Sequence, residues 1–287
     1  MNEKPTKTLP VLDWTPALSQ QFWGRLAGTT FLERIAFSRF AAPYLVELVK
    51  SYFPENSRVL DYGSGYNLYL VRELLKQGFR TAFYEPSVPA DEQIRFIEQD
   101  ARFLGAVTEV SPGEFDVVFL SEVIEHLFDD EIPATLSRLH DSLSSNGILV
   151  VTTPCNENLF EASRFCPTCE HLFHPWGHVR SFSPESLEKL LGEHGFRCEA
   201  QWNVDLSGTR NLAEELISLK DRIARLVAKI EETSARGDAE TPQAAALAAS
   251  VTATFQDVKG AFDTRDPARC QIGFGGTIVI VARRQAM

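Results

Sequence analysis

Two carboxylates and one imidazole stand close together near the middle of this 287-residue chain. Glu122, Glu125 and His126 follow the apolar segment 115–120 with the spacing i, i+3 and i+4. In a helix, this spacing places three side chains on one face. Carboxylates and an imidazole can share a divalent cation such as Mg²⁺, and His126 alone can accept a proton near neutral pH. The group predicts a metal site or a general base.

Thiols and imidazoles form a second group, with the pattern C-x2-C-x4-H-x3-H over residues 166–178. Two cysteines on a tight turn, followed by histidines, are typical of tetrahedral structural zinc. The predicted ligands are Cys166, Cys169 and His174, with one of His178, His171 or Cys155 as the fourth. In the alternative, the thiols carry no metal and the histidines line the substrate site. Because His178 cannot serve both groups, Cys155 is the ligand that would resolve the conflict.

The segments that must position these residues alternate between strand and helix patterns. Residues 58–61 predict a strand, residues 68–75 a helix and residues 79–84 the next strand. Further strands are expected over 115–120, 148–152 and 276–283, and further helices over 121–127, 136–143 and 182–195. This alternation predicts an α/β protein with a doubly wound parallel sheet, covered by helices on both faces.

Four regions organise the chain. Residues 1–57 predict an N-terminal helical cap with Pro43 as the joint between two helices, and residues 58–203 predict the α/β core, with the zinc knuckle at 155–178. Residues 204–271 predict an inserted helical hairpin, and residues 272–287 predict the final core strand. Three roles are open for the hairpin: packing on its own domain, a homodimer contact or a lid over the active site.

A glycine turn lies where such a sheet binds a ligand. Gly63 and Gly65 follow the first strand, and Glu85 ends the second. Parallel sheets bind ligands beyond the carboxyl ends of their strands, and glycines allow the backbone to approach a ligand closely. A carboxylate at Glu85 can accept hydrogen bonds from both hydroxyls of a ribose. Asp100 and Ala101 are candidates to hold an adenine, so the pattern predicts a nucleoside-containing ligand.

These motifs resemble those of the class I S-adenosylmethionine-dependent methyltransferases, over roughly residues 40–200 and the last strand. Four stretches carry the resemblance: VLDYGSG at 59–65, YEP at 84–86, FDVV at 115–118 and SEVIEHL at 121–127. The resemblance implies a Rossmann-like methyltransferase fold and S-adenosylmethionine as methyl donor. The implied donor-binding residues are Asp61, Gly63, Gly65, Asn67, Glu85, Asp100, Ala101 and Ser121. The two glycines would contact the methionine part, Glu85 the ribose, and Asp100 and Ala101 the adenine.

One position departs from the family pattern. The third glycine of the motif is replaced by Asn67, which tolerates a left-handed backbone, so an adjusted loop is expected rather than lost binding. A nicotinamide-binding domain is the competing interpretation, but the third glycine of its G-x-G-x-x-G motif would be Leu68.

The E-x-x-E-H pattern at 122–126 also resembles ubiquinone-biosynthesis O-methyltransferases and small-RNA 2′-O-methyltransferases. That resemblance implies a metal that polarises a substrate hydroxyl, and a further downstream histidine, which His178 matches. Other members of the family use the same Glu-His pair without metal to orient a helix. In that case His126 or His178 is the expected general base.

The sequence therefore predicts methyl transfer to a hydroxyl, or secondarily an amine, of a small metabolite, sugar or aromatic acceptor. The alternatives are a catalytically degenerate scaffold and a metal-dependent RNA 2′-O-methyltransferase. A net charge of −11 disfavours nucleic acid as a partner. Because no segment reaches the roughly 18–20 apolar residues of a membrane span and the N-terminus lacks the apolar part of a secretory signal, a cytoplasmic protein is expected.

Overall fold

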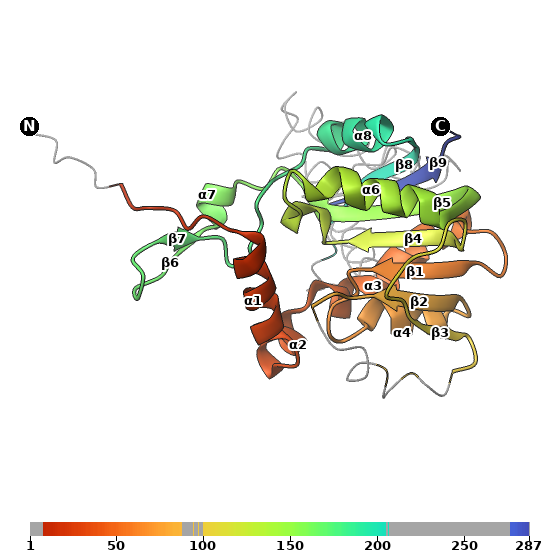
Figure 1. The fold of residues 1–287 in the computed structure, drawn as a ribbon, viewed down its shortest axis with the longest axis horizontal. Coiled ribbons are helices and arrows are strands. Elements are labelled where there is room, and N and C mark those ends of the chain that lie inside the picture. Colours follow the sequence, from red (N-terminus) through yellow and green to blue (C-terminus); the bar gives the residue numbers. More distant parts are fainter. Residues whose placement is uncertain are drawn as a thin grey trace, which may run out of the picture. The chain divides into compact units, whose positions relative to one another are not determined.

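The computed structural model describes residues 8–87, 94, 97, 100–204, 206 and 276–286 (Figure 1). Nearly all of the predicted helical hairpin at 204–271 lies outside these residues, so the three roles suggested for it stay predictions. Within the described residues, no helix is both long enough and apolar enough to cross a membrane.

In the described part of the chain, seven strands form one sheet in the order β3-β2-β1-β4-β5-β9-β8 (Figure 1). The strands are β1 (Arg58–Tyr62), β2 (Arg80–Tyr84), β3 (Phe103–Ala106), β4 (Phe115–Ser121), β5 (Leu143–Pro154), β8 (Phe196–Val204) and β9 (Thr277–Arg284). Neighbouring strands from β3 to β5 run parallel, whereas β9 runs antiparallel to both β5 and β8. The α/β class is confirmed, but the sheet is mixed rather than wholly parallel.

Helices cover both faces of this sheet. The helices are α1 (Pro16–Leu26), α2 (Thr30–Ile35), α3 (Phe37–Val49), η1 (Lys50–Tyr52), α4 (Tyr69–Lys76), η2 (Ile124–His126), α6 (Glu131–Ser142), α7 (Leu159–Ala162) and α8 (Pro184–Glu193). Leu136 of α6 and Leu187 of α8 share a buried cluster with Ala82, whereas Val71 of α4 packs with Phe83. Since neighbouring strand residues point to opposite faces, Ala82 and Phe83 mark the two layers of the core.

The N-terminal helices differ from the prediction. Pro43 lies inside α3, and the breaks between helices fall at 27–29 and at Ala36. The apolar side chains on both sides of Pro43 form one buried stripe: Ala41, Ala42, Leu45, Val46 and Val49. Burial of this stripe outweighs the backbone hydrogen bond that a proline removes, so the helix continues through it.

A small hairpin between β5 and α8 is absent from the sequence-based expectations. It pairs β6 (Arg164–Phe165) with β7 (Leu172–Phe173) in antiparallel fashion. Leu172 also forms a bridge with Val11 of the N-terminal segment. Strands of two residues are too short to show the alternation of apolar and polar residues by which strands are predicted.

Helix α8 begins with a complete capping box, although its third position is serine instead of Glu or Gln. Ser183 Oγ accepts the Ser186 N–H at 3.1 Å, and Ser186 Oγ accepts the Ser183 N–H at 2.9 Å. The Ser186 hydroxyl therefore does what the longer side chains usually do.

Replacing Ser183 with Ala should lower the free energy of unfolding by about 1 kcal/mol, because the N-terminal N–H groups of α8 lose their acceptor. Urea titration of the variant checks this, with Glu188→Ala on the exposed side of the same helix as the control. Equal midpoints for the two variants would contradict the role given to the cap.

Candidate active site

The carboxyl ends of β1, β4 and β5 meet at one edge of the sheet. These strands end at Tyr62, Ser121 and Pro154, and the segments that follow them carry most of the predicted site residues. The ends of β8 and β9 next to the insertion, Val204 and Thr277, pair at this same edge. The edge therefore has the position at which open α/β sheets bind their ligands.

The turn after β1 requires a glycine. Gly63 has φ +83°, and its N–H donates to the Tyr84 carbonyl at 2.8 Å. A Cβ at this position would lie 2.5 Å from Val123 Cγ2, which is closer than real atoms approach. Gly65 has φ +65°, but nothing among the described residues lies within 4 Å of where its Cβ would be. Of the two glycines in this turn, Gly63 is the one at which both the backbone conformation and the space demand glycine.

Glu85 closes the glycine turn. Its carboxylate accepts the Gly65 N–H at 2.8 Å and the Ser87 N–H at 2.9 Å. The two residues lie at the ends of neighbouring strands, which is why the sequence pattern places them together. The predicted ribose-binding carboxylate thus lies beside the predicted methionine-binding turn.

An adjusted loop is expected around Asn67, and the residue with the left-handed backbone is the next one in the chain. Leu68, with φ 50°, is the left-handed residue that precedes α4. A left-handed leucine is uncommon because its Cβ crowds the following carbonyl oxygen. Its side chain is 2% exposed and packs against Val71 and Phe83, so burial holds the unusual backbone in place.

Asp61 is buried behind the turn. Its Oδ2 has no hydrogen-bond partner among the described residues. Burial, and next the negative charge of Glu85, raise the pKa of Asp61 to about 8. The carboxyl is therefore mainly protonated at neutral pH unless a positive group lies beside it.

Asp100 and Ala101 do not lie at the ligand edge. Both precede β3, whose carboxyl end is Ala106, and Thr81 at the start of β2 donates its N–H to the Arg102 carbonyl. Asp100 instead binds the Arg102 guanidinium, which lowers the pKa of Asp100 to about 2. The prediction requires the third strand to end before residue 100, whereas β3 begins at Phe103, so the predicted adenine contact falls at the opposite edge.

The prediction of a helix over 121–127 is wrong. Glu122 therefore does not share a helix face with Glu125 and His126. Ser121 is the last residue of β4, Glu122 has φ 53°, and only Ile124–His126 form a short 3-10 turn. Thr152 Oγ1 donates to Glu122 Oε1 at 2.9 Å and also lies 2.9 Å from Ser121 Oγ. Burial raises the pKa of Glu122 to about 7, and the negative charge of Glu157 adds to this effect.

Glu125, His126 and His178 do come together, and we call them the two-histidine cluster. Glu125 Oε1 lies 4.0 Å from Nε2 of His126 and 4.0 Å from Nε2 of His178. These three groups place one ligand atom each within 4.8 Å of one another. Glu125 is 1% exposed, and its Oε1 has no hydrogen-bond partner among the described residues. A buried carboxylate oxygen without a hydrogen-bond partner, beside two imidazoles, could hold a cation.

Hydrogen bonds on the far side of each imidazole fix which nitrogen faces the cluster. His126 Nδ1 lies 3.4 Å from the Gly177 carbonyl, and His178 Nδ1 lies 2.5 Å from Glu157 Oε2. A carbonyl and a carboxylate only accept, so each Nδ1 carries a hydrogen, and in the neutral form of each ring Nε2 then offers a lone pair to the cluster. Burial, and next the neighbouring His178, lower the pKa of His126 to about 3, so its ring is neutral.

Burial also raises the pKa of Glu125, and the charge of Glu122 adds to the effect. Thr153 Oγ1 donates to the other carboxylate oxygen of Glu125 at 3.0 Å, which orients the group. A positive ion beside Glu125 Oε1 would offset the cost of burying its charge.

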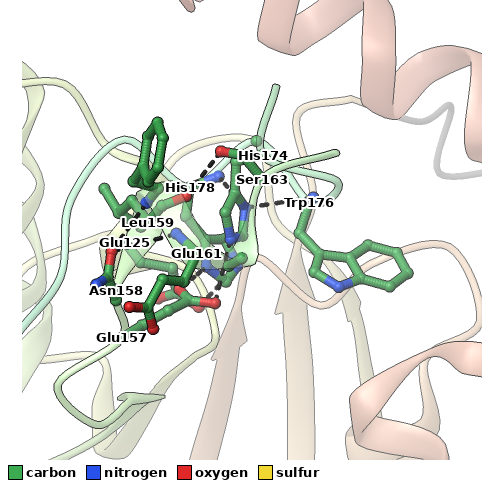
Figure 2. A network of polar contacts seen from close by, with 12 residues as sticks. Glu125, Glu157, Asn158, Leu159, Glu161, Ser163, His174, Trp176 and His178 are labelled. Carbon is green, nitrogen blue, oxygen red and sulfur yellow. Dashed lines mark hydrogen bonds and ion pairs between the residues drawn. The ribbon is translucent and has the colours of Figure 1, made fainter. Parts of the chain in front are cut away.

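His174 is buried next to the cluster, and with Glu157 and His178 it forms a second group whose ligand atoms lie within 4.8 Å of one another. Its Nδ1 accepts the N–H groups of Trp176 at 3.4 Å and His178 at 3.1 Å. Its Nε2 must therefore carry the hydrogen, which it donates to Glu157 Oε1 at 3.1 Å (Figure 2). His174 thus supports the cluster from outside, and with both nitrogens engaged in this way its assignment as a zinc ligand stays a prediction.

The two knuckle cysteines are free thiols in the turn of the β6–β7 hairpin. Within the described residues, neither belongs to a group of three His, Cys, Asp or Glu side chains close enough to share an ion. Hydrogen bonds from the N–H groups of Cys169 and Thr168 lower the pKa of Cys166. His171 Nδ1 turns to the Cys169 carbonyl, and Cys155 accepts from the Asn203 amide at 3.3 Å. The expected zinc ligands are therefore not assembled.

Sequence reasoning missed two contributors to the site. Glu157 lies three residues after the end of β5, and a carboxylate so close to a strand end is a signal that could have been used. Trp23 of α1 contacts the His126 ring edge-on, with 5.2 Å between ring centres. No local pattern relates a residue of the N-terminal helices to the cluster.

Because the folded state holds its proton at Asp61 up to about pH 8, the unfolded state binds fewer protons between pH 4 and 8. The contribution of Asp61 to the free energy of unfolding is therefore complete below pH 4 and is lost as the pH rises through 8. Over this range the free energy of unfolding falls by at most about 1.4 kcal/mol per pH unit. Asp61→Asn should flatten the fall. Urea titrations of both proteins across this range check the prediction, and parallel curves would contradict it.

The comparisons with known proteins agree with this geometry. A family model described as a methyltransferase domain matches residues 32–201, which is more than half of the chain. Among curated proteins, none matches the sequence.

Three solved structures show the same fold. The first is 1,6-didemethyltoxoflavin-N1-methyltransferase of Burkholderia thailandensis with bound 1,6-didemethyltoxoflavin and S-adenosylhomocysteine, at 14% identity over 100% of this chain and 99% of that chain, with a TM-score of 0.56. The second is a SAM-dependent methyltransferase of Archaeoglobus fulgidus, at 16% identity over 88% and 98% of the chains, with a TM-score of 0.50. The third is the 4+2 cyclase SpnF, at 18% identity over 98% and 100% of the chains, with a TM-score of 0.54.

At these identities the likeness establishes the fold and not the reaction, and the cyclase shows that the fold serves more than one chemistry. The family match, which spans both the glycine turn and Glu125–His126, supplies the activity class. The chain belongs to the methyltransferase domain family, and it has the fold of S-adenosylmethionine-dependent methyltransferases of known structure.

Proposed function

We propose that this enzyme methylates a hydroxyl group of a small molecule, and that the two-histidine cluster holds a divalent cation beside that hydroxyl. One observation carries the proposal. Three ligand atoms, a carboxylate oxygen without a partner and two imidazole Nε2 atoms, converge at the sheet edge next to the glycine turn.

The donor is assigned to the glycine turn. Gly63 and Gly65 would contact the methionine part of S-adenosylmethionine, and Glu85 would bind the ribose. Asn67 follows this turn in the chain, and Ser121 ends β4, the strand that pairs with β1, so we keep both as donor-binding residues. Since the sulfonium already activates the methyl group, the protein has mainly to place the donor and the acceptor oxygen in line.

The donor atoms of the cluster fit a cation. Nitrogen and oxygen ligands suit Zn²⁺, Mn²⁺ and related ions, and metal ligation requires histidines that are neutral, as the pKa of His126 allows. Ligands of one ion lie about 3.0–3.4 Å apart when the bonds are near 2.1 Å, so the three atoms, which lie within 4.8 Å of one another, would have to move closer together when an ion binds. A bound divalent cation would lower the pKa of a substrate hydroxyl that it contacts.

The protonation of His126 favours a bound cation over a mechanism in which His126 is the general base. With a pKa of about 3, the His126 ring is a poor proton acceptor near neutral pH. His178 faces the cluster with a bare Nε2 and is the group placed to take the hydroxyl proton if no metal binds. A hydroxyl acceptor is favoured over an amine because an oxygen is the atom that such a cation binds and activates.

Treatment with a chelator should abolish formation of S-adenosylhomocysteine from a panel of phenols, sugars and hydroxy acids, and Mn²⁺ should restore it. Glu125→Gln should weaken Mn²⁺ binding in calorimetry by roughly 10- to 100-fold, since it removes a ligand. Glu122→Gln is the matched control, because Glu122 bonds to Thr152 and acts on Glu125 only through its charge, so it should lower Mn²⁺ affinity much less than Glu125→Gln. Turnover that is insensitive to the chelator, or an equal loss in both variants, would overturn the metal assignment.

Gly63→Ala should reduce the affinity for S-adenosylhomocysteine by about tenfold or more, because the new Cβ meets Val123 and the backbone is strained by about 1–2 kcal/mol. Gly65→Ala carries comparable strain without the clash and should lose less. Adding Val123→Ala to Gly63→Ala should recover part of the loss. Unchanged affinity in Gly63→Ala would show that the donor binds elsewhere.

A further inference from the structure

We propose that Glu157 is a positioning residue that sets the tautomer of His178, so that its Nε2 lone pair, and not an N–H, faces the cluster. The inference rests on the proposed function only for its consequence in metal binding. The tautomer itself follows from the hydrogen bonds around Glu157 and is measurable without metal, donor or acceptor.

Glu157 is hydrogen-bonded to two histidines through its carboxylate (Figure 2). One carboxylate oxygen accepts from His178 Nδ1 at 2.5 Å and the other from His174 Nε2 at 3.1 Å. The rings of His174 and His178 are stacked with 4.2 Å between their centres, and both are buried. Each imidazole therefore has a single fixed partner on the carboxylate.

His174 cannot exchange its tautomer, because backbone groups hold it. Its Nδ1 accepts two N–H groups, from Trp176 and His178, so its hydrogen stays on Nε2. Whatever side chain occupies position 157 must then present an acceptor to His174. When residue 157 carries a carboxylate, its second oxygen is also an acceptor, so His178 donates a hydrogen to it from Nδ1.

A glutamine at position 157 has the same shape but only one acceptor. Its oxygen must turn to His174, which leaves its NH₂ group facing His178 Nδ1. That nitrogen can then only accept, so the hydrogen of His178 moves to Nε2 and points at Glu125. The substitution reverses the tautomer of His178 while it conserves the volume and the hydrogen-bond count.

Nitrogen-15 NMR of the full chain measures this directly, because the sequence has only six histidines and the two neutral tautomers have distinct Nδ1 and Nε2 shifts. A His178→Gln spectrum assigns the resonance. The wild type should show His178 protonated at Nδ1, Glu157→Gln should show it protonated at Nε2, and Glu157→Asp, which keeps a carboxylate, should retain the wild-type tautomer. Mn²⁺ affinity in Glu157→Gln should fall by roughly 10- to 100-fold.

The control is Glu161→Gln, an identical change in charge on the exposed side of α7 that should alter neither His178 nor Mn²⁺ affinity. Binding of S-adenosylhomocysteine reports that each variant is folded. An Nε2-protonated His178 in the wild type, or an unchanged tautomer in folded Glu157→Gln, overturns the inference. If the wild type binds no Mn²⁺ but shows the expected tautomers, the metal assignment fails and the role of Glu157 stands.

Discussion

The close approach of Gly63 to Val123 is the contact on which the arrangement of the site depends. The turn that follows β1 and the segment that follows β4 touch where a Cβ would lie 2.5 Å from Val123 Cγ2. Val123 directly precedes the turn that carries Glu125 and His126, so the missing side chain sets how near the donor loop lies to the two-histidine cluster. A methyl transfer that needs donor and acceptor in line depends on that separation.

Buried carboxyl groups give this edge of the sheet its electrostatic character. Burial raises the pKa values of Asp61, Glu122 and Glu125, to about 8 for Asp61 and about 7 for Glu122. Each of these charges is costly unless a positive group lies near it. A sulfonium donor and a divalent cation are both positive. Glu157 is the contrast: burial would raise its pKa, but hydrogen bonds from His174 and His178 lower it to about 2, so it stays ionised.

The sequence was sufficient where local patterns and strand ends decide the outcome. It predicts the strand, glycine turn and helix around Gly63, the pairing of that turn with Glu85, and the association of Glu125 and His126 with His178. It fails where neighbours decide: Pro43 continues a helix because its face is buried, and Glu122 leaves the expected helix because β4 extends one residue further. His174 resembles a zinc ligand in spacing, but backbone N–H groups, which spacing does not reveal, occupy its Nδ1.

The most direct test is a crystal structure of the full chain with S-adenosylhomocysteine and Mn²⁺, recorded with anomalous diffraction at the manganese edge. The account predicts S-adenosylhomocysteine on the turn of Gly63 and Gly65, and one manganese peak bounded by Glu125 Oε1 and the Nε2 atoms of His126 and His178. S-adenosylhomocysteine on the turn with no manganese in the cluster would contradict the account of the acceptor side. S-adenosylhomocysteine bound at another part of the chain would contradict the account as a whole.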